Sequence, residues 1–115
     1  MIHEILYTEA DKRLRRRVKA LLERKLPVRV RTCSHIDSKR IRPVHMEAAL
    51  FIFGDQSSER MGKSMKRLEK LRAENRQVLL FAGVSRIPKV PYYPRWRLGN
   101  GTRLLEEVSF LLPVS

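Results

Sequence analysis

The sequence predicts an α/β fold: a small doubly wound parallel sheet of about four strands with helices on both faces. Four short runs of the length typical of strands, three of them apolar and one alternating Val and Arg, are spread along the 115-residue chain. Amphipathic segments with an apolar stripe follow the first and third of these runs, and another lies near the end. Strands that alternate with helices call for parallel pairing and right-handed crossovers. A chain of this length is expected to form one domain, residues 1–115.

The first strand and helix are predicted in the N-terminal quarter of the chain. Residues 2–7 are mostly apolar, with β-branched and aromatic members, and predict a buried strand. Apolar residues then recur at helical spacing over residues 9–25. Thr8 is expected to cap this helix, with Glu9 and Asp11 in its first turn, where the helix dipole favours acids.

The next two strands differ in their patterns. Residues 28–32 alternate Val and Arg, which predicts a strand with one exposed face at or near the sheet edge. The polar segment 33–46 leaves room for only a turn or two of helix. Residues 48–53 form the most apolar window of the chain and predict the central strand.

The second half of the chain repeats the alternation and ends in an irregular loop and a helix. A helix capped by Ser57 or Ser58 is expected to bury a stripe of Met61, Met65, Leu68 and Leu71. Residues 78–81 predict the fourth strand. Residues 84–101 contain three prolines and no regular periodicity, so a loop is expected there. Thr102 is expected to cap a last helix that Pro113 ends.

The composition indicates the class of partner. The chain has 25 Lys plus Arg against 12 Asp plus Glu, a net charge of +13, which favours nucleic acid or an acidic protein partner. No window approaches the ~18 apolar residues of a membrane span, and no leader peptide is evident at the N-terminus. The lone Cys33 favours a reducing compartment, and we expect a cytoplasmic protein.

A proline-rich segment and the first helix supply the candidate partner-binding residues. Residues 91–97 combine two tyrosines, a tryptophan and two arginines, and the stretch 77–103 has five bases and no acid. Such a loop suits stacking on bases or anchoring a protein interface. The alternative is that its rings cover the sheet edge while the arginines are solvated. The candidates are Arg13, Arg16, Arg17, Arg86, Lys89, Tyr92, Tyr93, Arg95, Trp96 and Arg97.

Three carboxylates are the candidate catalytic residues of an alternative function. Glu9, Asp11 and Asp55 follow the first and third predicted strands, whose carboxyl ends meet at one edge of a parallel sheet. Carboxylates gathered there would suit Mg²⁺. The simpler interpretation, which we favour, is that the first two begin a helix and the third opens a turn; no cofactor is then expected.

Several segments together match the pattern of a known family: residues 5–11, 14–24 and 28–32, Arg42-Pro43, and the helix and strand around residues 68–82. Through them residues 2–83 resemble the bacterial response-regulator receiver domain, which has a flavodoxin-like fold. The family's acidic pair is represented by Glu9 with Asp11 nearby, and its phospho-acceptor by Gly54 or the displaced Asp55. Ala82 stands for its hydroxyl residue, and Lys89 is the nearest match to its lysine. The resemblance implies a degenerate receiver that binds partners without ordinary phosphotransfer.

A second resemblance is to the Toprim nucleases and primases, which place Glu after the first strand and Asp-x-Asp after the third. Glu9 and Asp55 match two of these three positions, and Ser57 replaces the third acid.

Our hypothesis is a non-enzymatic regulatory or binding protein that engages nucleic acid or an acidic protein. The alternative is a metal-dependent Toprim-like nuclease or phosphotransfer domain that uses Glu9 and Asp55.

Overall fold

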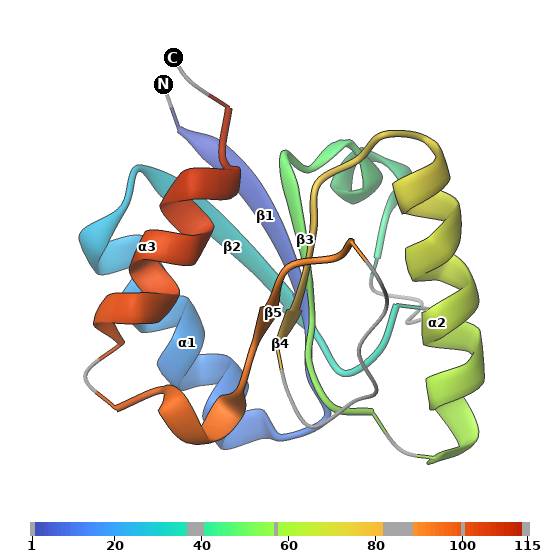
Figure 1. Ribbon diagram of the computed structural model, residues 1–115, viewed down its shortest axis with the longest axis horizontal. Helices are drawn as coiled ribbons and strands as arrows, with labels where there is room; N and C mark the ends of the chain where they lie inside the picture. The colour runs from blue at the N-terminus through green and yellow to red at the C-terminus, as the bar shows by residue number, and fades with distance from the viewer. Residues whose placement is uncertain (1, 37–40, 57, 82–88, 100, 114–115) are drawn as a thin grey trace.

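The computed structural model describes residues 2–36, 41–56, 58–81, 89–99 and 101–113. These residues form a central five-stranded sheet with helices packed against it (Figure 1). The strand order is β2-β1-β3-β4-β5, and every pairing is parallel. The strands are β1 (His3–Thr8), β2 (Val28–Cys33), β3 (Leu50–Phe53), β4 (Val78–Phe81) and β5 (Tyr92–Tyr93). The predictions that β3 is central and that β2 lies at an edge are therefore confirmed.

Three α-helices cover both faces of the sheet, as predicted. They are α1 (Lys12–Lys25), α2 (Ser58–Ala73) and α3 (Thr102–Leu111). Figure 1 shows α1 and α3 on one face and α2 on the other. Two short 3-10 helices, η1 (Pro43–Glu47) and η2 (Arg95–Arg97), lie in the connections. No helix in the described part of the chain is long and apolar enough to cross a membrane.

The sheet separates two hydrophobic cores, because successive residues of a strand point to opposite faces. In β1, Ile5 and Tyr7 join the core under α1 and α3, whereas Leu6 joins the core under α2. In α2, Leu68 and Leu71 are buried as predicted, whereas Met61 and Met65 are only half-buried. Strands β1, β3 and β4 are thus buried on both faces, which explains their continuous apolar runs.

Two predicted helix starts are wrong. Helix α1 begins at Lys12, and its cap is Asp11, whose Oδ1 accepts a hydrogen bond from the Leu14 amide at 3.1 Å. Thr8 instead ends β1, which extends further than the apolar run alone indicates. Helix α3 is preceded by Gly101 rather than capped by Thr102, because the backbone there has a φ of +82°, which favours glycine.

The fifth strand lies inside the segment expected to be a loop. Only Tyr92 and Tyr93 form it, and two residues are too few to show a strand periodicity in sequence. The Leu80 amide donates to the Pro91 carbonyl at 2.9 Å, and the Tyr93 ring stacks on Phe81 with centroids 5.5 Å apart. This strand fixes the start of the connection that carries η2.

Candidate functional site

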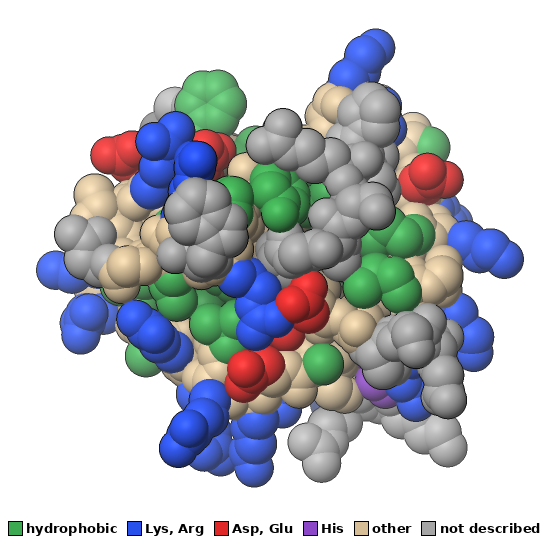
Figure 2. Space-filling view, turned by 60° about the horizontal axis from the view of Figure 1, so that its bottom comes forward, with side chains coloured by type: hydrophobic (Ala, Val, Ile, Leu, Met, Phe, Trp, Pro, Cys, Tyr) green, Lys and Arg blue, Asp and Glu red, His purple; other side chains and the backbone are tan. Residues whose placement is uncertain are grey.

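The carboxyl ends of β1 and β3 form the candidate site. Thr8 and Phe53 are paired neighbours, and the amide of Gly54 donates to the Thr8 carbonyl at 2.6 Å. The Ala10 amide donates to the Asp55 carbonyl at 2.8 Å, which joins the two loops that follow the strands. Figure 2 looks onto this edge and shows acidic side chains beside basic ones near its middle, with more basic side chains around them.

Arg95 of η2 joins the three predicted carboxylates. Its Nη1 donates to Asp55 Oδ2 in an ion pair, and its Nη2 lies 3.5 Å from Asp11 Oδ2 and 3.8 Å from Glu9 Oε1. We call these four residues the Arg95 cluster. The three acids thus meet one internal cation at the sheet edge, whereas the favoured prediction gave Glu9 and Asp11 only a role at a helix start and Asp55 a role in a turn.

Glu9 is the most enclosed member of the cluster, with no exposed surface. Its Oε2 accepts the Asp11 amide at 3.2 Å, and the Tyr7 hydroxyl donates to its Oε1 at 3.4 Å. Burial raises the pKa of Glu9, and the Asp11 amide and Arg95 only partly oppose this rise. Glu9 is thus more than a residue that favours a helix start, because it lies inside the protein beside a cation.

Arg95 and Tyr7 also respond to this environment. Burial by itself lowers the pKa of Arg95, but its hydrogen bond to Asp55 and the nearby charge of Glu9 raise that pKa overall. Burial and the charge of Glu9 raise the pKa of Tyr7, so its phenol stays protonated. The cluster therefore pairs a permanent cation with the carboxylates, and Tyr7 serves as a neutral donor.

Gly54 allows Glu9 to take this position. A Cβ atom at residue 54 would lie 2.6 Å from Glu9 Oε1 and 2.9 Å from the Thr8 carbonyl oxygen. Both distances are shorter than a carbon atom tolerates without movement of its neighbours. The place directly after β3, where the resemblance to receivers expects a phospho-acceptor, is thus filled by the carboxylate of Glu9.

The carboxylates do not fit a divalent cation in this arrangement. Asp55 is bound to the Arg95 guanidinium, which also lies against the other two acids. Among the described residues, no three His, Cys, Asp or Glu side chains are placed to hold a metal ion. The guanidinium supplies positive charge where the alternative function requires Mg²⁺.

The predicted partner-binding residues divide between surface and interior. Arg13, Arg16 and Arg17 are exposed on α1, and Arg17 Nη2 donates to the Gly99 carbonyl at 3.3 Å, which brings α1 beside the segment after η2. Lys89 and Arg97 are exposed as well. Arg86 and the Trp96 side chain lie outside the described part of the structure.

Tyr92, Tyr93 and Arg95 are less exposed than residues of a surface loop are expected to be. Tyr93 is 2% exposed, and its hydroxyl donates to the Arg97 carbonyl at 2.6 Å, so its ring belongs to the core. Tyr92 is half-buried against the α2 core. The alternative prediction for this segment is that its rings cover the sheet edge, and Tyr93 fits that alternative. Arg95 belongs to the acidic site, and nothing local in the sequence links it to residues 84 and 40 positions away.

Comparisons with known proteins agree with the topology. No protein-family model matches the chain, and no curated protein matches it. Among solved structures, the chain is similar to a response regulator receiver protein from Pseudoalteromonas atlantica, with a TM-score of 0.69 and 16% sequence identity. The similarity covers 94% of this chain and 95% of that one, whereas the sequence resemblance covered residues 2–83. The chain therefore has a doubly wound, flavodoxin-like fold of the receiver type.

Proposed function

We propose that this chain is a non-enzymatic binding domain on a receiver-like fold, and that its partner is an acidic protein. The observation that carries the proposal is the Arg95 cluster, in which an arginine of the chain itself neutralises Glu9, Asp11 and Asp55. A site closed by an internal cation is suited to holding η2 in place. It is poorly suited to cycling a metal ion and a phosphoryl group.

Phosphotransfer needs an accessible carboxylate after β3. Gly54 has no carboxylate, and the space for one is taken by Glu9. Asp55 follows, but its side chain is engaged by Arg95. A nuclease that relied on Glu9 and Asp55 would meet the same obstacle, because its metal ion would have to displace the guanidinium. These contacts favour the binding function over both enzymatic alternatives.

The choice between an acidic protein and nucleic acid rests on the aromatic residues. Stacking on bases needs exposed rings, and of the two tyrosines considered for it, Tyr93 is buried and Tyr92 is half-buried. Exposed basic residues lie on both sides of the sheet. Examples are Arg13 and Arg16 on α1, and Lys63 and Lys70 on α2. In the described part of residues 91–97 no ring is fully exposed, and charge without exposed rings in this segment suits carboxylates on a protein better than single-stranded nucleic acid.

Two assays test this function. In the first, the protein is incubated with acetyl phosphate and Mg²⁺ and its intact mass is measured. No mass increase is expected, whereas a phosphate adduct lost in Asp55→Asn would contradict the proposal.

In the second assay, fluorescence anisotropy compares a polyglutamate peptide with an oligothymidylate of equal length at several salt concentrations. The peptide should bind, and more weakly as salt rises. Preference for the oligonucleotide would favour nucleic acid.

A further inference from the structure

We infer that the surface between η1 and α2 binds an acidic amphipathic helix of a partner protein, an inference that rests on the proposed function. This surface contains a hollow of about 590 Å³, within the ~300–1,000 Å³ typical of ligand clefts. We call it the η1–α2 hollow. It lies on the opposite face of the sheet from α1, and none of its residues is among the partner-binding candidates that the sequence provides.

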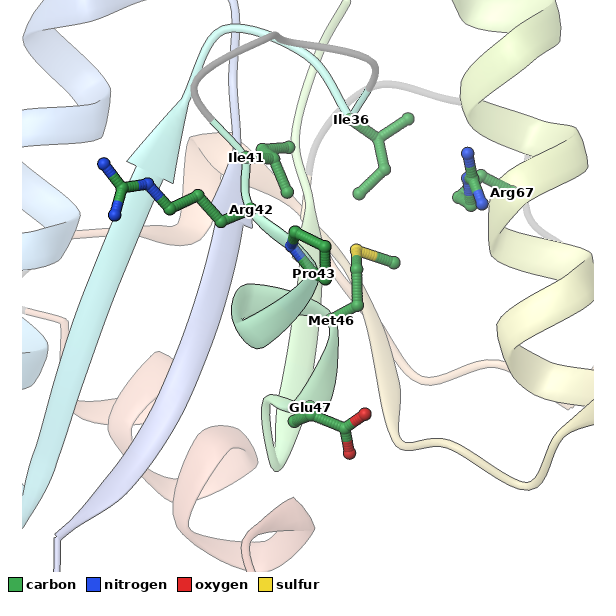
Figure 3. Close-up of a pocket in the computed structure, with 7 residues that line it drawn as sticks. All are labelled: Ile36, Ile41, Arg42, Pro43, Met46, Glu47 and Arg67. Carbon is green, nitrogen blue, oxygen red and sulfur yellow. The ribbon is translucent and has the colours of Figure 1, made fainter.

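The centre of the hollow is apolar. Figure 3 shows Ile36, Ile41 and Met46 gathered between η1 and α2, with Arg42 directed away from them. Ile41 and Met46 are only partly buried and rest on the core beneath α2, so the apolar surface is continuous with that core. On the same 3-10 helix, Val44 is 68% exposed. A partner that brings its own apolar side chains would remove this surface from water.

A row of cations borders the hollow on the α2 side. Lys63, Lys66, Arg67 and Lys70 line a second hollow of about 500 Å³, and Arg67 lines both hollows, so the two adjoin. Their spacing of three, four and seven residues places them on one side of α2, over a length of about 10 Å. The three lysines are exposed, and no ion pair between described side chains involves them.

The combination of an apolar centre and a basic border specifies the partner. Carboxylates would face the row on α2, while apolar side chains on the adjacent face of the same partner helix would enter the hollow. Glu47 lies at the end of the hollow remote from Ile36 and Ile41, and would repel a carboxylate placed there (Figure 3). The partner's acids are therefore expected along α2.

Two other kinds of occupant fit less well. An extended peptide that adds a strand needs a free sheet edge, and the edges are at β2 and β5, whereas this hollow lies between η1 and α2. Single-stranded nucleic acid needs aromatic platforms, and the described residues that line the two hollows include no aromatic side chain. An acidic helix uses both the apolar and the basic parts of the surface.

The test measures binding of a labelled peptide designed as an amphipathic helix, with leucines on one face and glutamates on the others. A scrambled peptide of the same composition controls for charge alone. The variant Lys63→Glu/Lys66→Glu/Lys70→Glu should bind the designed peptide at least about tenfold more weakly. The matched control Lys12→Glu/Arg24→Glu/Lys25→Glu changes the net charge equally at exposed positions of α1 that are not partner-binding candidates, and should retain most of the affinity.

The apolar part of the surface has its own variant. Met46→Gln keeps the charge and the side-chain length, and should weaken the designed peptide several-fold while leaving the scrambled peptide unchanged. If Met46→Gln does not fold, the exposed lysine variant still decides the question. Circular dichroism and urea unfolding establish which variants are folded.

The outcomes separate this surface from the proposed function. If the α1 and α2 variants lose affinity equally, or if the scrambled peptide binds as well as the designed one, the η1–α2 hollow is not the binding surface. The acidic-partner function would survive that result. If the wild-type protein binds neither peptide, the proposed function fails as well. Tighter, α2-dependent binding of an oligothymidylate would replace the acidic helix with nucleic acid.

Discussion

Replacing Arg95 with methionine tests the Arg95 cluster most directly. The side chain of Arg95 is 28% exposed, and those of Glu9, Asp11 and Asp55 are 0%, 50% and 35% exposed. Methionine keeps most of the apolar stem but removes every charged contact. The three acids would then lie together without a cation, and Glu9 would be the most penalised because it cannot reach water.

The size of the effect follows from these contacts. The hydrogen-bonded pair with Asp55 is worth about 1.5–3 kcal/mol, and the exposed pair with Asp11 adds at most about 1 kcal/mol. Breaking a fully buried pair costs about 3–5 kcal/mol, which is an upper bound because Arg95 is partly exposed. We therefore expect Arg95→Met to lower the free energy of unfolding by about 2–4 kcal/mol at neutral pH, a large part of the ~5–15 kcal/mol of an ordinary domain.

The loss should depend on pH with a definite sign. The pKa of Glu9 in the folded protein is raised above its ordinary value of 4.5, so its burial is unfavourable above that pKa and costs nothing below pH 4.5, where the group is protonated in both states. Arg95 lowers this pKa, and its removal would raise it further. The destabilisation by Arg95→Met should therefore be largest at neutral pH and shrink as the pH falls through the folded pKa towards 4.5.

Urea unfolding followed by circular dichroism measures both quantities, with midpoint and slope determined at each pH. Arg16→Met, at an exposed position on α1, is the control and should change stability by less than about 0.5 kcal/mol. A loss of less than about 1 kcal/mol in the free energy of unfolding at neutral pH would refute the reasoning, because ion pairs between exposed side chains can contribute that much by themselves. So would a loss that grows on acidification.

Two further predictions concern Gly54 and Cys33. Gly54→Ala places a Cβ atom 2.6 Å from Glu9 Oε1 and should cost about 1–3 kcal/mol in urea unfolding, whereas Gly62→Ala, a position in α2 with no neighbour within 4 Å, should stabilise the protein by about 0.5–1 kcal/mol. Equal effects of the two substitutions would contradict the close contact at residue 54. Burial raises the pKa of Cys33 to about 11, so at neutral pH iodoacetamide should modify the thiol slowly in the folded protein and rapidly in urea. Rapid labelling of the folded protein would show that the thiol is accessible.

Local patterns in the sequence determine most of the fold. The apolar runs of β1, β3 and β4 are continuous because both faces of these strands are buried, and the Val-Arg alternation of β2 reflects its place at the edge. The order of strands and helices then leaves one economical arrangement, a parallel sheet with helices on both faces. That arrangement also places Glu9 and Asp55 at one edge, because parallel strands end together.

The tertiary structure alone decides what those acids do. Arg95 reaches Asp55 and Asp11 across 40 and 84 positions of sequence, a contact that depends on β5, and two residues carry too little pattern to predict that strand. The same pairing buries Tyr93, whose sequence neighbours favour an exposed loop. Periodicity encodes which residues face the core within one element. Which cation meets which carboxylate depends on how separate elements pack, and that information is distributed over the whole chain.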